Sequence, residues 1–218
     1  MRLNELFLSI QGETSSAGLP TIFVRFTGCN LRCTYCDTTY SYYEGDAITP
    51  EDVMERIRSL ACKRVCLTGG EPLIQPRAEM QALLDLLATE GYEVSIETDG
   101  SIDISKFNLH PRQRFIVDMK VPSSGMSDKM HLPNLQHLVP ERDEVKFVVG
   151  DRADYEWCTA LIDQHGLDPQ KGYQLLFSPV FGEIEPVELV NWVLEDRLDA
   201  RFQLQLHKIV WDKDKRGV

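Results

Sequence analysis

The sequence lacks several features that would assign a class of protein at once. Its 218 residues contain 23 Lys and Arg against 34 Asp and Glu, so there is no excess positive charge to attract nucleic acid or an anionic membrane. No apolar run approaches the ~20 residues that a membrane helix needs. The first residues, Met1 to Phe7, also lack the basic, apolar and small-residue succession of a signal peptide. We therefore expect a cytoplasmic protein that binds neither nucleic acid nor membrane.

Internal repeats, low-complexity tracts and an evident linker are also missing from the sequence. Its composition, with 43% hydrophobic and 26% charged residues, is ordinary for a globular protein. A chain of this length is long enough to bury a substantial core. We therefore expect a single domain over residues 1–218.

Six cysteines are present, and in a reducing cytosol they are expected to bind metal or stay free. Cys29, Cys33 and Cys36 form a C-x3-C-x2-C run with no fourth cysteine within reach. A structural zinc site needs four protein ligands. A [4Fe–4S] cluster held by three thiolates instead keeps one iron open to a small molecule, so this run favours a cluster at which chemistry occurs. Structural thiols, and zinc with a distant fourth ligand, remain alternatives. Of the other cysteines (Cys62, Cys66, Cys158), Cys62 and Cys66 are interpreted as structural.

Helix and strand patterns alternate along most of the chain, which predicts an α/β protein with parallel strands joined by helices. The expected strands are Leu3–Ile10, Thr21–Phe26, Arg64–Thr68, Glu93–Glu97, Phe115–Met119, Val145–Val149, Tyr173–Phe177 and Phe202–Leu206. The expected helices are Pro50–Leu60, Arg77–Glu90, Ala153–His165 and Pro186–Asp196. Functional groups in such folds collect at the carboxyl ends of the strands.

One such strand end carries the segment Thr68-Gly69-Gly70-Glu71-Pro72. Two successive glycines permit backbone conformations closed to other residues and let the main chain approach a ligand closely. By itself, Gly-Gly indicates only a turn. Together with the three-cysteine run, it resembles the radical S-adenosylmethionine (SAM) superfamily.

Further segments resemble one family within that superfamily, the 7-carboxy-7-deazaguanine synthases. They are Ile10-Gln11-Gly12-Glu13, Gly18-Leu19-Pro20, Phe23-Val24-Arg25-Phe26, Gly28-Cys29-Asn30-Leu31, Cys36-Asp37-Thr38, Ile96-Glu97-Thr98-Asp99-Gly100, Asp118-Met119-Lys120 and Pro122-Ser123-Ser124-Gly125-Met126. The resemblance is clear over residues 3–126 and weaker beyond, where Arg201 to Lys208 resembles the final strand of the family. It implies a radical SAM enzyme that converts 6-carboxy-5,6,7,8-tetrahydropterin into 7-carboxy-7-deazaguanine with loss of ammonia, on the route to queuosine and other deazapurines.

The resemblance also implies the fold, the cofactors and the site. The fold would be an incomplete parallel (β/α)6-type barrel in a homodimer, and the cofactors a [4Fe–4S] cluster, SAM and Mg²⁺, with a flavodoxin-like or ferredoxin-like electron donor. The cluster would be held by Cys29, Cys33 and Cys36, and Mg²⁺ by Thr38. Substrate would contact Ile10, Gln11, Gly12, Arg25 and Thr68, and SAM would contact Tyr35, Cys36, Asp37, Gly70, Asp118, Met119, Lys120, Ser178, Pro179, Val180 and Phe181.

Residue chemistry supports some of these roles and leaves alternatives open for others. The Arg25 guanidinium can pair with both oxygens of a carboxylate, and the hard hydroxyl oxygen of Thr38 suits Mg²⁺. Alternatively, Arg25 forms a structural ion pair, Thr38 caps its loop, and Asp118 and Lys120 form a salt bridge with each other. No histidine, His207 included, is selected as a ligand, and the family's terminal-carboxylate role is not assigned to Val218.

Two other functional classes compete with this interpretation. A glycyl-radical-activating enzyme would share the cysteine run and the compact size but would not need Arg25 and Thr38 around a small pocket. A non-catalytic iron–sulfur or zinc module would need only the cysteines.

Overall fold

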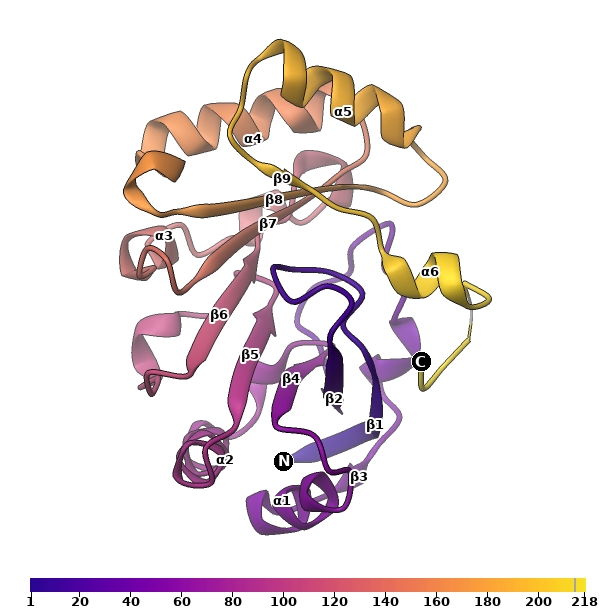
Figure 1. Ribbon diagram of the computed structural model, residues 1–218, viewed down its shortest axis with the longest axis vertical. Coiled ribbons are helices and arrows are strands. Elements are labelled where there is room, and N and C mark those ends of the chain that lie inside the picture. Colours follow the sequence, from indigo (N-terminus) through magenta and orange to yellow (C-terminus); the bar gives the residue numbers. More distant parts are fainter. Residues whose placement is uncertain (214) are drawn as a thin grey trace.

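The computed structural model describes residues 1–213 and 215–218, and its framework is one strongly curved, nine-stranded sheet (Figure 1). The strand order is β3-β1-β2-β4-β5-β6-β7-β8-β9. Seven neighbouring strands run parallel: β2 (Pro20–Phe26), β4 (Arg64–Gly69), β5 (Glu93–Thr98), β6 (Gln113–Asp118), β7 (Glu144–Val149), β8 (Gln174–Pro179) and β9 (Arg201–Phe202). Two antiparallel strands, β1 (Arg2–Ile10) and β3 (Asp46–Ala47), complete one edge.

The main helices cover the convex outer side of the sheet, so its concave side is left for a site (Figure 1). They are α1 (Pro50–Arg58), α2 (Arg77–Thr89), α4 (Arg152–His165) and α5 (Pro186–Glu195), with the short α3 (Asn134–His137) and α6 (Leu206–Val210) in loops. The apolar stripe predicted on α2 is buried: Met80, Leu83, Leu84 and Leu87 are all fully inaccessible. The predicted start of α1 is also present, because Thr49 accepts a hydrogen bond from the Asp52 amide and Pro50 begins the helix.

The predicted incomplete barrel is confirmed as an open, mainly parallel sheet. Six of its parallel strands have six or seven residues, and β9 has only two. In the described part of the chain, the β9 edge forms no ladder with the β3–β1 edge, so the sheet does not close. The loop between β1 and β2 lies across the concave side, and α6 follows β9 beside the open edge (Figure 1).

Most expected elements are present with ends shifted by one or two residues, and β1 pairs antiparallel with β2 because the loop of residues 11–19, not a helix, connects them. One expected element was wrong. The strand expected over Phe202–Leu206 ends at Phe202, and Leu206 begins α6. The chain leaves the sheet there because the side chains of Gln203 and Gln205 bond to the β1–β2 loop.

No helix among the described residues is both long and apolar enough to cross a membrane.

Candidate functional site

A cavity of about 420 Å³ lies on the concave side of the sheet, towards the carboxyl ends of the parallel strands. This volume is within the usual range for small-molecule sites. The lining includes residues from β1, β2, β4, β5, β6 and β7, from the loops after β2 and β8 and from the carboxyl-terminal segment. Its polar and cysteine members include Gln11, Glu13, Arg25, Cys29, Cys33, Cys36, Asp37, Thr38, Thr68, Glu97, Asp99, Asp118, Lys120, Lys146, Gln205, His207 and Lys208.

The three cysteines of the C-x3-C-x2-C run all face this cavity from the loop that follows β2. Their thiols are partly buried, and none of the six cysteines forms a disulfide. Burial, opposed by a hydrogen bond from the Leu31 amide, raises the pKa of the Cys29 thiol to about 12. Burial also raises the pKa of Cys33. These thiols therefore need a nearby positive charge, such as that of a metal, to become thiolates at neutral pH.

Gly70 brings a second loop against the cysteine loop. A Cβ atom at Gly70 would lie 2.0 Å from the carbonyl oxygen of Gly28 and 2.9 Å from the Cβ of Cys29, so no other residue fits without moving backbone. The amide of Glu71 donates to the same Gly28 carbonyl at 2.8 Å. The loop after β4 is thereby held in contact with the loop that carries the thiols.

The Glu71 carboxylate extends this connection to the end of β5. It is fully buried and accepts hydrogen bonds from the Asp99 amide at 2.6 Å, the Leu73 amide at 2.8 Å and the Thr98 hydroxyl at 3.0 Å. Burial and the nearby charge of Asp99 raise its pKa well above the usual range. Glu71 thus connects the loops after β4 and β5 beside the cysteines.

Arg25, near the end of β2, lines the cavity, and its guanidinium is held in place by Glu5. Its Nε donates to Glu5 at 2.7 Å, and Tyr40 donates to the same Glu5 oxygen at 2.9 Å. The structural ion pair that was an alternative role for Arg25 is therefore present, with Glu5 as the partner. It uses Nε, so the two terminal guanidinium nitrogens remain to pair with a carboxylate in the cavity.

Thr38 lies on the cavity wall directly after the last cysteine of the run. Its hydroxyl donates to Asp37 Oδ1 at 2.8 Å, and Asp37 Oδ2 pairs with Lys208 Nζ at 2.6 Å. Because the hydroxyl proton is engaged, the Thr38 oxygen keeps its lone pairs for a metal ion. Thr38 occupies the N-cap position of the short helix that follows it, but its hydroxyl makes no capping hydrogen bond there.

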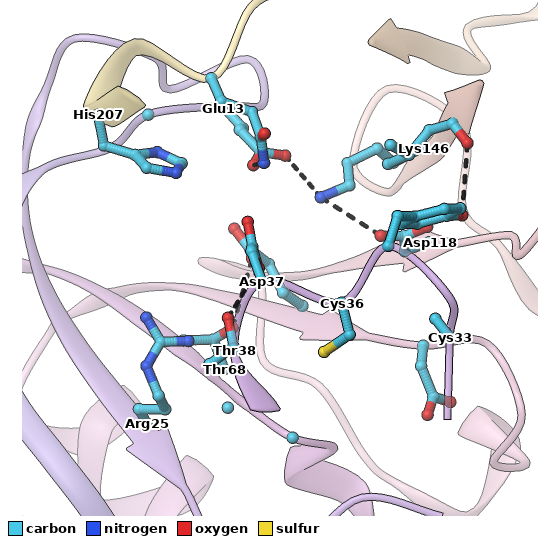
Figure 2. A pocket seen from close by; sticks show the side chains of 18 of the residues that line it. Glu13, Arg25, Cys33, Cys36, Asp37, Thr38, Thr68, Asp118, Lys146 and His207 are labelled. Carbon is cyan, nitrogen blue, oxygen red and sulfur yellow. Dashed lines mark hydrogen bonds and ion pairs between the residues drawn. The ribbon is translucent and has the colours of Figure 1, made fainter. Parts of the chain in front are cut away.

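Four buried or half-buried charges of alternating sign cross the cavity, and Figure 2 shows three of them, Asp118, Lys146 and Glu13. Lys120 lies 3.0 Å from Asp118, Lys146 lies 3.4 Å from the same Asp118 oxygen, and Lys146 lies 2.6 Å from Glu13. The predicted salt bridge between Asp118 and Lys120 is therefore present, and both residues also line the cavity. Lys146 extends the chain of charges to the β1–β2 loop.

The carboxyl-terminal segment forms one wall of the cavity, which the sequence pattern did not predict. The Leu206 amide donates to the Gly12 carbonyl at 3.0 Å, and Gln205 donates to Glu13 at 2.8 Å. A Cβ atom at Gly12 would lie 2.2 Å from His207 Nδ1, so glycine at this position lets His207 reach the cavity. Burial lowers the pKa of His207. In the sequence, only the weak family resemblance of residues 201–208 indicated that this segment belongs to the site.

The structure brings most of the predicted site residues together. All the proposed cluster, magnesium and substrate residues line the cavity, as do Tyr35, Asp37, Gly70, Asp118, Lys120, Val180 and Phe181. Three proposed SAM contacts, Met119, Ser178 and Pro179, are outside the lining residues. The side chain of Met119 is fully buried in the core, so only its backbone could face a ligand.

Comparison with known proteins places this site in a class. Residues 23–109 match the model of the Radical SAM superfamily, and this range includes the three cysteines and Gly70. The chain is 40% identical to the 7-carboxy-7-deazaguanine synthase of Koribacter versatilis, with both proteins covered completely. It is 42% identical to that of Chlorobaculum tepidum over 100% of this chain and 97% of the relative. The chain therefore belongs to the 7-carboxy-7-deazaguanine synthase family.

A solved structure agrees with the fold. The crystal structure of QueE from Escherichia coli superposes with a TM-score of 0.75 at 24% identity, covering 93% of each chain.

Membership of the radical SAM superfamily implies a [4Fe–4S] cluster and SAM, and the residues present fit both. Among the described residues, no three His, Cys, Asp or Glu side chains are placed to hold a metal ion. A cluster makes a different demand, because each thiolate binds its own iron, and three thiols on one loop facing one cavity meet it. Asp118 Oδ1 and Ser178 Oγ are buried without a partner in the described structure, so Asp118 offers a cavity ligand an unused acceptor.

Proposed function

We propose that this chain is a carbon–nitrogen lyase that converts 6-carboxy-5,6,7,8-tetrahydropterin into 7-carboxy-7-deazaguanine and ammonia, in queuosine or related deazapurine biosynthesis. The observation that carries this proposal is one cavity that combines three cysteines with Arg25 and Thr38. A cysteine-only module would not need a carboxylate-pairing arginine and a hard oxygen donor in the same cavity. Full-length relatives bearing the synthase name support the same reaction.

On the side of the cavity nearest the cysteine loop, Cys29, Cys33 and Cys36 would hold the cluster. SAM would contact Gly70, Asp118 and Lys120, with further contacts from Tyr35, Cys36, Asp37, Met119 and Ser178–Phe181. When bound, the cluster and SAM together supply the radical that removes a hydrogen atom from substrate. The chain's own contribution is to keep the two loops in contact through Gly70 and Glu71.

On the other side, Arg25 would pair with the substrate carboxylate, and Ile10, Gln11, Gly12 and Thr68 would hold the ring system. Fixing the carboxylate fixes the adjacent carbon, which keeps its hydrogen at one place relative to SAM. The Thr38 oxygen would ligate Mg²⁺, which normally takes its other ligands from water and substrate oxygens. The β1–β2 loop and the segment from Gln205 to Lys208 would keep bulk water away from the reacting atoms.

The enzyme would work as a single domain in a homodimer, in the cytoplasm, with a flavodoxin-like or ferredoxin-like protein as electron donor. Six free cysteines suit a reducing compartment.

An anaerobic assay of the iron-loaded protein with carboxytetrahydropterin, SAM and reductant, with and without Mg²⁺, tests this function. We expect 7-carboxy-7-deazaguanine and 5′-deoxyadenosine, with a lower rate when Mg²⁺ is removed. SAM cleavage without conversion of the pterin would favour another radical SAM reaction, such as activation of a glycyl-radical protein. Absence of 5′-deoxyadenosine from cluster-loaded protein would contradict the enzyme assignment altogether.

A further inference from the structure

Lys146 is a buried cation in the interior of the sheet with a partner on each side of the cavity. It lies in the middle of β7, and its side chain is 9% exposed. Its ammonium pairs with Glu13 at 2.6 Å and with Asp118 at 3.4 Å (Figure 2). Glu13 belongs to the loop that carries the proposed substrate contacts, and Asp118 belongs to the proposed SAM contacts.

The backbone of Lys146 also contacts the segment that carries the proposed SAM contacts Asp118 and Met119. Asp118 is its register partner across β6 and β7, and the Met119 amide donates to the Lys146 carbonyl at 2.8 Å. Lys146 and Lys120 both approach Asp118 Oδ2, while Oδ1 has no partner among the described residues. The two lysines therefore fix the carboxylate with one oxygen left for a ligand.

The loop that carries the proposed substrate contacts is held by the same Lys146 ammonium, through Glu13. Glu13 is 8% exposed, and its two oxygens are engaged by Lys146 and by Gln205 at 2.8 Å. Removing Lys146 would leave a buried carboxylate without its cation, which is unfavourable unless the loop moves. Lys146 therefore holds the β1–β2 loop in place through Glu13 and also fixes the position of the Asp118 carboxylate.

Stability alone does not require a lysine at this position. A buried ion pair can often be replaced by apolar side chains of similar volume without loss of stability, because burying the charges is itself costly. Lys146 also makes its two ion pairs with segments that lie more than 100 residues apart in the chain. An apolar residue at this position could not form ion pairs with both Glu13 and Asp118.

We propose that Lys146 is a positioning residue that couples the two sides of the cavity, so that binding of SAM and binding of the pterin favour each other. The inference rests on the proposed function, since it takes the pterin as the ligand beside Glu13. Each ligand would favour the arrangement of Lys146, Glu13 and Asp118 that the other ligand requires. Such coupling is reciprocal, so either ligand can be used to measure it.

The test measures the dissociation constant of SAM for cluster-loaded protein, with and without carboxytetrahydropterin, in the absence of reductant so that neither is consumed. In the wild-type protein, we expect the pterin to tighten SAM binding by about fivefold or more. Lys146→Met should bring this ratio to about one while the iron content remains that of the wild type. A Lys146→Arg variant, which keeps the charge, should retain part of the coupling.

A second variant covers the case in which Lys146→Met does not fold. The double variant Lys146→Met, Glu13→Gln removes the uncompensated carboxylate and should load the cluster, but its coupling ratio should still be about one. Arg142→Met is the matched control, because Arg142 pairs with the buried Asp143 at 2.7 Å away from this cavity. It should lower stability and leave the ratio unchanged.

Two results would overturn the inference: a wild-type ratio of about one, or a wild-type ratio retained in a folded Lys146→Met variant. Product analysis separates these results from failure of the proposed function. A wild-type enzyme that forms the deazaguanine without Lys146-dependent coupling contradicts only the inference. A wild-type protein that does not bind the pterin contradicts the proposed function and this inference with it.

Discussion

The two sides of the cavity are built in different ways. The thiol side, defined here as Cys29, Cys33, Cys36 and Gly70, has its three sulfurs on one eight-residue stretch and its glycine on a neighbouring loop. The pterin side, defined as Gln11, Glu13, Arg25, Thr38, Gln205 and His207, draws on the two ends of the chain, on β2 and on the loop after β2. The first can be identified from spacing, whereas the second is assembled by contacts between distant segments.

The largest expected effect comes from the thiol side. Cys33→Ser should abolish measurable product formation, because a cluster ligand is lost and the serine oxygen is a poor replacement for a thiolate. Iron and sulfide content of the purified protein provides the direct measurement. Cys62→Ser is the control: Cys62 is half-buried and outside the cavity, so iron content should stay at the wild-type level. Equal iron loss in both variants would argue against a specific role for the run.

Gly70→Ala should lower kcat/KM by about a hundredfold, because the added Cβ must displace the backbone at Gly28 and shift the SAM contacts. The dissociation constant of SAM should rise correspondingly. Gly91→Ala is the comparison, since a Cβ there has open space and meets only the cost of a φ of +72°. That variant should be less stable with normal SAM binding. Equal SAM affinity in the two variants would show that the close approach at Gly70 is unimportant.

Arg25→Ala tests the pterin side. It should raise KM for carboxytetrahydropterin about tenfold or more through loss of a charged hydrogen bond, while leaving the cluster spectrum and the SAM affinity unchanged. Glu5→Gln is the control, because it weakens the ion pair behind Arg25 and keeps the guanidinium. Its effect on KM should be smaller. Loss of the cluster in Arg25→Ala would assign the residue to structure instead.

The smallest effect concerns a separate ion pair at the cavity, between Asp37 and Lys208. Partial desolvation opposes ionisation of the Asp37 carboxyl, but the charge and hydrogen bond of Lys208, with the Thr38 hydroxyl, outweigh it and lower the pKa. A lowered folded-state pKa stabilises the protein above the unfolded-state value of about 3.9 and stabilises it progressively less as pH falls below that value. Because Asp37 is half-exposed, Asp37→Asn should reduce the free energy of unfolding at pH 7 by no more than about 1 kcal/mol.

Denaturant titrations of wild type and Asp37→Asn at pH 7 and at stepwise lower pH would check this sign. The difference between the two proteins should shrink as the pH falls below about 4. A difference that grows on acidification would contradict the assigned ion pair.

The parts of this molecule that could be predicted are those encoded over short stretches of sequence. The stripe on α2 and the cap at Thr49 depend on neighbours within one or two helical turns, and both are present. The strand predicted over Phe202–Leu206 failed because Gln203 and Gln205 bond to Thr14 and Glu13, about 190 residues away in sequence. Local apolar alternation carries no information about such a contact.

The residues of the site likewise fall into those that short sequence patterns predict and those that long-range contacts bring to the cavity. Spacing and glycine chemistry single out the cysteine loop and Gly69-Gly70, and the family resemblance adds Arg25 and Thr38. Lys146 and His207 carry no such signal: one is a lysine in an apolar strand and the other lies in a segment with only a weak resemblance. They reach the cavity because the sheet curves, the β1–β2 loop lies across its concave side, and the last segment packs on Gly12.

The sequence by itself determined the three-thiolate loop, the glycine turn and the alternation of strands and helices, because each depends on residues that are close along the chain. Only the tertiary structure decided which charges share the cavity. Pairing of β6 with β7 places Asp118 beside Lys146, and the β1–β2 loop brings Glu13 to the same ammonium. Because Glu13 and Lys146 are buried there, either charge would be costly without the other. Long-range geometry, which no local pattern encodes, therefore sets the relation between the two sides of the site.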